Sequence, residues 1–392
     1  MLGLSSQAPE SPGPQRPRVL AVFGCHDIIL IRAPPHYHRD VSEPARQSVT
    51  LWLQPGQAPL ARGIVEHARL IVMGVGSSEP SRAEALAGDF GGSPLSDLRH
   101  ALSSCKTNAF LILDPGDFGC ASPATDAAVL RDAADRGVRV ASLEPMPASL
   151  LDLVTDARAL GEEPFAGSIR QQWARFVPLG RRMRPIPEVL ELLGTFGPVR
   201  SASIRLFAAT TEGSLAARLL DAMDLVLALL GEPEIVEASL LTAVAGKGVY
   251  LTPGESLRGP PALHGDLTAN LRFAGGRAAS LHLSDQSGPW TRHIALSGPA
   301  GRIDIHNHDF EWHAPDGRLL DHSTRPAPSA PVAAFDLAGD IADQLTTLLA
   351  IGSAEPGLPN YPRALALAQA ALLSARTGEG EAPNTISRMA GA

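Results

Sequence analysis

Strands and helices alternate from residue 48 to residue 147, and this alternation is the feature that most limits what the chain can fold into. Short apolar runs such as SVTLWL and NAFLILD are separated by stretches with helical spacing such as SRAEALAGDFG. Strands joined in this way through helices form a parallel sheet with helices on its faces. The sequence therefore predicts a Rossmann-like α/β domain over residues 48–148.

The pattern changes in the second half of the chain. Runs such as LTANLRFA, AASLHLSDQ and TRHIALSG alternate apolar and polar residues, which is typical of a sheet with one covered face. We expect a second α/β domain with an open, mostly antiparallel sheet. The predicted segments are a Pro- and Ser-rich flexible tail at 1–18, an N-terminal extension at 19–47, the Rossmann-like domain at 48–148, the open-sheet domain at 149–334, and C-terminal helices at 335–392 that pack back on the first domain.

One stretch of the second domain, residues 212–233, predicts a helix that is buried along most of its length. Its apolar residues recur at helical spacing, and Gly231 followed by Pro233 marks its end. The charges inside it, Arg218, Asp221 and Asp224, are three residues apart and share one stripe. We expect this stripe to face solvent or a functional site.

Charge and cysteine content exclude several classes of protein. A formal net charge of −8 without a Lys/Arg cluster argues against nucleic acid as a partner. Three widely spaced cysteines without a CxxC pair suit a reducing compartment. No apolar run approaches the roughly 20 residues that span a bilayer, and no basic start precedes an apolar stretch. We expect a cytoplasmic protein that does not contact a membrane.

Four stretches, in this order, resemble the Gfo/Idh/MocA family of nicotinamide-dependent sugar and polyol oxidoreductases. They are WARFVPLGRRMRPIPEVLELLGTFGPV, DAMDLVLALLGEPEIVEA, HIALSGPAGRIDI and ALALAQAALLSARTGEGE. The resemblance covers roughly residues 48–381. It implies a Rossmann-like domain followed by an α/β domain whose open sheet forms a subunit interface, and hence a homo-oligomer or a hetero-oligomer.

The cofactor cradle of that family is degraded in this sequence. A dinucleotide fold needs a Gly-rich turn after the first strand and an acidic residue near the end of the second. The first turn here is QPGQAP, with Gly56 alone, and the second strand ends in MGVGSS, with Gly76 but without a carboxylate. Gly56 and Gly76 are the candidate cofactor-binding residues, although both suit ordinary turns. We therefore expect no cofactor, or NAD(P) if the protein is an active oxidoreductase that holds its cofactor by other contacts.

The catalytic groups that the resemblance implies are also replaced. The segment that matches the family's Glu-Lys-Pro motif reads Leu143-Glu144-Pro145, so a carboxylate stands where the family has a lysine. Asp221 stands where the family has the histidine of an Asp-x-x-x-His relay. One interpretation is that Asp221 pairs with Arg218 on a solvated stripe. The other is that Asp221 and Glu144 face each other in the cleft and act as an acid and a base.

These substitutions leave three hypotheses for function. The first is a homologue without ordinary hydride transfer that acts as a binding, scaffolding or regulatory subunit for a sugar-related ligand or an active paralogue. The second is an active NAD(P)-dependent oxidoreductase on a sugar or polyol with unconventional site residues. The third is a cofactor-free acid/base enzyme that uses Glu144 and Asp221.

No metal site is predicted, because no His, Cys or acidic cluster has a known zinc spacing. The N-terminal extension carries Cys25, His26, His36 and His38, and the sequence does not define their role.

Overall fold

The structure is a computed structural model of the 392-residue chain. By internal contacts the chain divides into two units, Met1–Pro44 and Ala45–Ala392, and every described residue belongs to the second unit. The described residues are 46–118, 123–146, 149–150, 153–154, 158, 174–244, 247–250, 263–323, 336–350 and 360–390. The predicted tail and the extension as far as residue 45, with Cys25, His26, His36 and His38, lie outside them.

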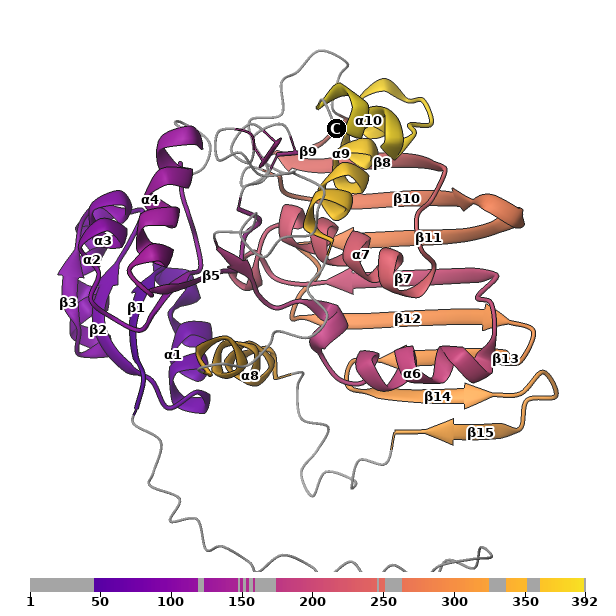
Figure 1. The fold of residues 1–392 in the computed structure, drawn as a ribbon, viewed down its shortest axis with the longest axis horizontal. Helices are drawn as coiled ribbons and strands as arrows, with labels where there is room; N and C mark the ends of the chain where they lie inside the picture. The colour runs from indigo at the N-terminus through magenta and orange to yellow at the C-terminus, as the bar shows by residue number, and fades with distance from the viewer. Residues whose placement is uncertain are drawn as a thin grey trace, which may run out of the picture. The chain divides into compact units, whose positions relative to one another are not determined.

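The first sheet has six parallel strands in the order β3-β2-β1-β4-β5-β6 (Figure 1). Its strands are β1 (Ser48–Trp52), β2 (Ile71–Gly76), β3 (Ser93–Leu95), β4 (Ala109–Ile112), β5 (Arg139–Ser142) and β6 (Arg175–Phe176). The order of connection reverses between β1 and β4, and open α/β sheets bind their ligands beside such a reversal, at the carboxyl ends of the strands. The predicted Rossmann-like sheet is confirmed.

Helices cover both faces of this sheet, which explains the continuous apolar runs of its strands. The helices that follow strands here are α1 (Ala58–His67), α2 (Pro80–Phe90), α3 (Leu98–Ser104) and α4 (Pro123–Asp135). Leu111 of β4 packs into the apolar cluster formed with α1, whereas its neighbours Phe110 and Ile112 pack into the cluster formed with α3 and α4. Alternate residues of one strand therefore belong to two different layers of the core.

The second sheet has nine strands in the order β15-β14-β13-β12-β7-β11-β10-β8-β9. They are β7 (Ser201–Phe207), β8 (Ile235–Val244), β9 (Lys247–Tyr250), β10 (Asp266–Phe273), β11 (Arg277–Ser284), β12 (Thr291–Gly298), β13 (Gly301–His306), β14 (Asp309–His313) and β15 (Leu319–His322). The pair β7–β11 is parallel and every other pair is antiparallel. This agrees with the predicted open, mostly antiparallel sheet.

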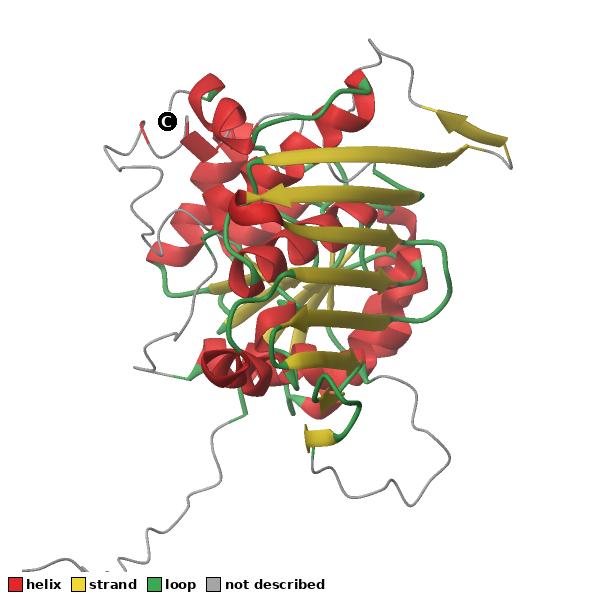
Figure 2. Cartoon of the chain, turned by 90° about the vertical axis from the view of Figure 1, so that its right-hand side faces the viewer, coloured by secondary structure: helices red, strands yellow, loops and turns green. Residues whose placement is uncertain are grey.

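One face of this second sheet is left open. Figure 2 shows its strands in front of the helices, which lie behind them. In β10 buried and exposed residues alternate along the strand, as a sheet covered on one face requires. The covered face carries α6 (Ile186–Phe196) and α7 (Leu215–Leu229).

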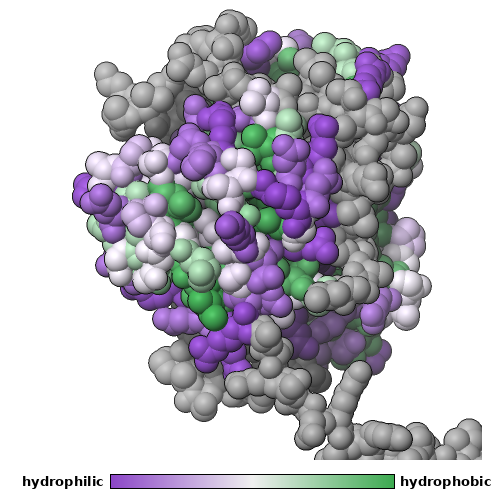
Figure 3. Space-filling view, turned by 60° about the vertical axis from the view of Figure 1, so that its left-hand side comes forward, coloured by the Kyte–Doolittle hydropathy of each residue, from purple (hydrophilic) through white to green (hydrophobic). Residues whose placement is uncertain are grey.

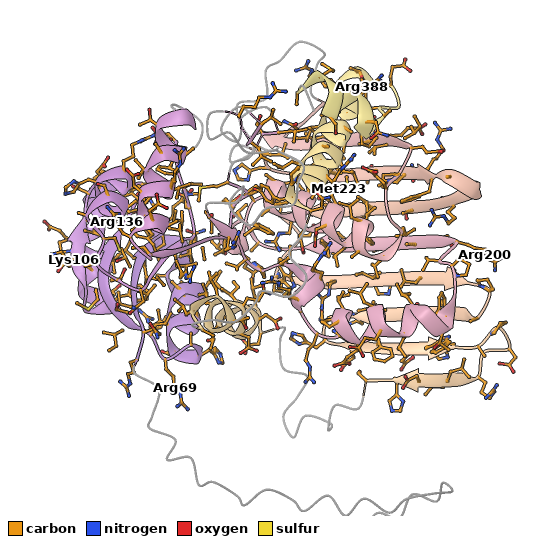
Figure 4. The ribbon with its side chains drawn as sticks, viewed as in Figure 1. Arg69, Lys106, Arg136, Arg200, Met223 and Arg388 are labelled. Atoms are coloured by element: carbon orange, nitrogen blue, oxygen red, sulfur yellow. The ribbon has the colours of Figure 1, made fainter. Side chains whose placement is uncertain are left out.

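Helix α7 is the most deeply buried helix of the second sheet's covered face. It begins after Ser214, whose hydroxyl accepts a hydrogen bond from Ala217 N at 3.2 Å. Gly231 follows its end with a φ of 85°, as predicted. Met223, labelled in Figure 4, is completely buried.

The polar stripe of α7 does not face solvent, which was one of the two expectations for it. Arg218 and Asp221 are 0% exposed and Asp224 is 1% exposed. The sequence pattern correctly located the stripe on one side of the helix. It did not reveal that other charged segments cover this side.

The C-terminal helices divide between the two sheets. Helix α8 (Leu337–Leu349) packs on α1, whereas α9 (Tyr361–Thr377) packs on β8 and α7, and α10 (Pro383–Met389) packs on α9. This arrangement differs from the sequence expectation that the whole segment packs on the first domain. The alanine-rich face of α9 fits closely against β8, and Ser374 Oγ accepts a hydrogen bond from Ala238 N at 2.9 Å.

Polar and apolar side chains are interspersed on the side of the surface that Figure 3 turns forward. Exposed large apolar residues occur singly or in pairs, and the two on β2 are Ile71 and Met73. Scattered residues of this kind are ordinary on a folded surface. In the described part of the chain, no helix combines the length and the apolar character that a membrane crossing requires.

Candidate functional site

A pocket of about 420 Å³ opens beside the point where the strand order of the first sheet reverses. The first sheet contributes the residues that follow β1, β4 and β5, and the second sheet's domain contributes the segment before α7 and the ends of β10 and β11. The described lining residues are Gln54, Gln57, Leu113, Asp114, Glu144, Thr210, Thr211, Ser214, His264 and Gln286. This is the position at which open α/β folds hold their ligands.

Glu144 is positioned at this pocket by β5 and is held at the start of α7. Its Oε1 accepts a hydrogen bond from Ser214 N at 2.8 Å, and its Oε2 accepts one from Ser214 Oγ at 2.5 Å. The side chain is only 6% exposed. Burial raises the pKa of Glu144 to about 7, against the opposing effect of the Ser214 bonds and the Arg218 charge. A carboxyl group with this pKa exchanges protons readily near neutral pH.

The turn after β1 is closed by its own side chains. Gln57 is buried, its Nε2 donates to Leu113 O at 3.1 Å, and its Oε1 accepts from Gln54 N at 3.0 Å. Gln54 Nε2 and Ser78 Oγ each donate to Asp114 Oδ2 at 2.7 Å. These bonds tie together the ends of β1, β2 and β4.

The two glycines predicted as cofactor-binding residues lie against protein side chains. A Cβ atom on Gly56 would lie 3.1 Å from Thr211 Cγ2, and a Cβ atom on Gly76 would lie 2.1 Å from Cε3 of the Trp52 ring. Gly76 is the last residue of β2 and pairs with Trp52 of β1. Close packing of the indole thus accounts for the glycine at position 76.

Replacing Gly76 with alanine is expected to destabilise the protein by about 1–3 kcal/mol, because the buried Trp52 ring must shift to admit a methyl group. Denaturant unfolding monitored by circular dichroism measures the effect. Gly88→Ala in α2 is the matched control. It meets no atom within 4 Å and should raise stability by about 0.5–1 kcal/mol. Equal stability of Gly76→Ala and wild type would contradict this account of the glycine.

Asp221 is not among the described residues that line the pocket. Its Oδ1 accepts a hydrogen bond from Gly180 N at 2.6 Å, and so it fastens α7 to the short 3-10 turn Gly180–Arg182. Burial raises the pKa of Asp221, while Arg218, Arg292 and Arg181 oppose that rise. The structure therefore places Asp221 in the interior and Glu144 in the pocket.

Arg218 is a completely buried cation whose charge acts on both of these carboxylates. Its guanidinium lies 3.8 Å from the centre of the Trp290 ring, and its Nη2 donates to Glu212 O at 3.1 Å. Among the described residues, its Nε and Nη1 have no hydrogen-bond partner. Burial lowers the pKa of Arg218 to about 10, and the carboxylates of Asp221 and Glu144 limit the fall. The charges of Arg218 and Asp221 act on each other within the interior, but no ion pair or hydrogen bond joins the two side chains among the described residues, and neither side chain is solvated.

The pocket also contains a histidine that was not among the residues predicted from the sequence. His264, 47% exposed, lies just before β10, and its Nδ1 is 2.6 Å from Oδ2 of the fully buried Asp285 just after β11. Asp285 also accepts hydrogen bonds from Gly265 N at 2.8 Å and Leu215 N at 3.3 Å. The pairing of β10 with β11 could have revealed this contact, because the start of the first strand meets the end of the second in an antiparallel pair.

The pocket has an acidic character. None of its described lining residues is Lys or Arg, whereas two of them, Asp114 and Glu144, carry carboxyl groups. The cations labelled in Figure 4, Arg69, Lys106, Arg136, Arg200 and Arg388, lie toward the outside of the ribbon. In the part of the chain that the structure describes, no three His, Cys, Asp or Glu side chains gather in a way that could hold a metal ion. Proton transfer and hydrogen bonding are the chemistry that this lining supports.

Several solved dehydrogenase structures are similar to this chain along nearly their whole length. UDP-N-acetylglucosamine 3-dehydrogenase from Acidithiobacillus ferrooxidans has a TM-score of 0.57 at 15% identity, over 85% of this chain and 98% of its own. Levoglucosan dehydrogenase in complex with NADH and levoglucosan has a TM-score of 0.61 at 16% identity, over 86% of this chain and 99% of its own. An oxidoreductase from Agrobacterium radiobacter in complex with NAD+, L-tartaric acid and magnesium has a TM-score of 0.60 at 14% identity, over 87% of this chain and 99% of its own.

These neighbours are Gfo/Idh/MocA-type dehydrogenases, and this chain has their two-domain fold. No family model and no curated protein matches the sequence. The resemblance in fold that the four stretches predicted is confirmed. At this identity the likeness concerns the fold, and function has to be argued from the pocket.

Proposed function

We propose that this protein binds a small, sugar-like hydroxylated ligand in the pocket without nicotinamide-dependent hydride transfer, and so acts as a binding or regulatory subunit. The observation that carries the proposal is the lining itself, an acidic pocket beside a closed β1 turn. Amide, hydroxyl and carboxyl groups surround it, and these groups exchange hydrogen bonds with sugar hydroxyls. The sugar dehydrogenases among the structural neighbours support the same ligand class.

The turn after β1 does not fit the pyrophosphate of a dinucleotide. Such a turn binds phosphate through backbone N–H groups at a helix N-terminus. Here Pro55 and Pro59 have no N–H. The N–H groups of Gln57 and Ala58 already bond to the carbonyl oxygens of Gln54 and Pro55. The nearby carboxylates of Asp114 and Glu144 would also repel a diphosphate.

Ligand binding is tested with isothermal titration calorimetry of sugars and polyols, using myo-inositol, levoglucosan and UDP-N-acetylglucosamine as the first probes. We expect Gln286→Trp, which places a large ring on the exposed rim of the pocket, to weaken the binding of any sugar that binds wild type by about tenfold or more.

Asn384→Trp on α10 is the matched control, since Asn384 is exposed, carries an amide like Gln286 and does not line the pocket. It should bind the sugar as wild type does. Absence of binding by a broad panel of sugars and polyols would refute the proposed function.

A second candidate is an NAD(P)-dependent oxidoreductase on a sugar or polyol with unconventional site residues. The NADH and NAD+ bound in the neighbouring structures favour it. This candidate requires that sugar-dependent reduction of NAD+ or NADP+ be detected by absorbance, and that Glu144→Gln abolish the turnover. This candidate also requires that the turn after β1 open when the ligand binds.

We further propose that the open face of the second sheet associates with another copy of the chain or with a related subunit. Support comes from the uncovered strands in Figure 2, whose exposed residues include Ser201 and Arg205 of β7. Light scattering coupled to size exclusion should give a dimer or a larger assembly. A monomer at micromolar concentration and in cell extract would contradict this expectation.

A further inference from the structure

We propose that Glu144 and His264 form an acid–base pair that moves a proton within a hydroxy-carbonyl sugar held in the pocket, with Asp285 as the residue that positions His264. This inference rests on the proposed function, because it needs the same ligand in the same pocket. In this pair, His264 takes the place of Asp221, which one interpretation of the sequence set opposite Glu144.

Asp285 fixes the orientation of the His264 ring. Asp285 is wholly buried and is held by the N–H groups of Gly265 and Leu215, so its carboxylate cannot turn away from the imidazole. Because a carboxylate accepts, Nδ1 of His264 donates to it. The other ring nitrogen, Nε2, then remains to act on a ligand, since His264 lines the pocket.

The charges around His264 favour its protonated form. The Asp285 hydrogen bond raises the pKa of His264, and the carboxylates of Glu144 and Asp114 add to the effect. The protonated His264 is therefore the proton donor of the pair, through Nε2–H. Asp285 keeps the imidazolium in place while it donates.

Glu144 is suited to accept a proton. Each of its carboxylate oxygens accepts one hydrogen bond from Ser214, and a carboxylate oxygen can accept a second. Because the carboxylate is buried, it is more basic than a carboxylate in water. The charged groups that also act on it are Arg218 and Asp114. Both members of the pair line the same pocket, so one bound molecule can contact both.

The reaction is an isomerisation that needs no cofactor. The Glu144 carboxylate removes the proton from the carbon next to the carbonyl group, and the electron pair of that C–H bond forms a C=C bond. The carbonyl π electrons move to oxygen, which takes the proton from His264 Nε2. The product is an enediol. Glu144 then gives its proton to the former carbonyl carbon, where the C=C electron pair forms the new C–H bond. The other enediol hydroxyl returns its proton to His264, and its O–H electron pair forms the new C=O bond of the isomeric sugar. Atoms and electrons balance without an oxidant or a reductant.

Exchange of carbon-bound hydrogen with solvent tests this step. The full-length protein is incubated in D2O with D-fructose or L-sorbose, and deuterium incorporation is followed by NMR. Wild type should catalyse exchange. Glu144→Gln and His264→Gln should each slow it by about 10²-fold or more while sugar affinity changes less than about threefold. D-glucitol, which has no carbonyl group, should bind without exchange.

Asp285→Asn separates a positioning role from a structural one. It should lower the pH at which exchange declines on the alkaline side, because the amide no longer favours the imidazolium, and it should reduce the rate at the optimum. His308→Gln is the control for the histidine variant, because His308 forms a similar 2.8 Å contact with Asp340 away from the pocket. Glu237→Gln on the exposed part of β8 is the control for the glutamate variant.

The outcomes distinguish the two proposals. If ketoses bind and no deuterium enters, or if exchange survives in both Glu144→Gln and His264→Gln, the acid–base pair is refuted while the binding function stands. If no sugar or polyol binds at all, the proposed function itself is refuted. Exchange that is lost in both variants and kept in both controls supports the pair.

Discussion

Arg218→Met is expected to lower the free energy of unfolding by about 3–5 kcal/mol, because it leaves the buried carboxylates of Asp221 and Glu144 without their central cation. The methionine replaces much of the apolar stem but neither the charge nor the stacking on Trp290. Urea denaturation at pH 7 measures the loss. The double variant Arg218→Met/Asp221→Asn should regain part of it, since one buried charge is then removed as well.

The matched control is Arg272→Met on the second sheet. Arg272 forms a 2.9 Å ion pair with Glu237, but its side chain is 64% exposed. Ion pairs of that kind contribute little, so the change in stability should stay within about 1 kcal/mol. If Arg218→Met loses no more stability than the control, the Arg218 charge does not stabilise the buried carboxylates.

Glu144→Gln is expected to be more stable than wild type at alkaline pH by about 3 kcal/mol. The folded-state pKa of Glu144 is about 7, against an ordinary value of 4.5, and each pKa unit corresponds to about 1.4 kcal/mol. Below the ordinary value both states hold the proton, and Glu144 costs nothing. Between the two values only the folded state holds it, so stability falls as pH rises through this window and stays low above it.

The variant lacks this titration, so its stability relative to wild type should increase between pH 4 and pH 8. Denaturant unfolding at several pH values measures the difference, in which the titration of groups that do not interact with Glu144 cancels. The free energy of unfolding of Glu237→Gln, at an exposed position on β8, should change with pH as that of wild type does over the same range. Parallel curves for Glu144→Gln and wild type would show that Glu144 is not held as a buried acid. Residues of functional sites often lower the stability of a protein in this way.

The sequence predicted the fold well because the fold depends on periodicity. The first-domain strands are continuous apolar runs, and β10 alternates with period two, so each pattern reports how many faces of its sheet are covered. The end of α7 was equally legible, since Gly231 adopts a positive φ that other residues disfavour. Short elements such as β3 and α10 were missed because they carry too few residues for a pattern to be visible.

The site was predicted only in part. Glu144 lines the pocket because it closely follows the end of β5, a position that the strand pattern indicates. Asp221 was assigned to the pocket by its position on α7, but a helix face alone does not tell which segment covers it, and here the turn at Gly180 does so. His264 and Asp285 are 21 residues apart and meet only through strand pairing, which single-sequence patterns do not specify.

Titration of the purified protein with NADH and NADPH, followed by nucleotide fluorescence and calorimetry, shows whether the closed turn after β1 and the acidic pocket hold a dinucleotide. We expect no saturable binding up to about millimolar nucleotide, the range in which affinity falls to roughly 4 kcal/mol. Saturable binding in the micromolar range, together with sugar-dependent reduction of NAD+ or NADP+, would contradict the account.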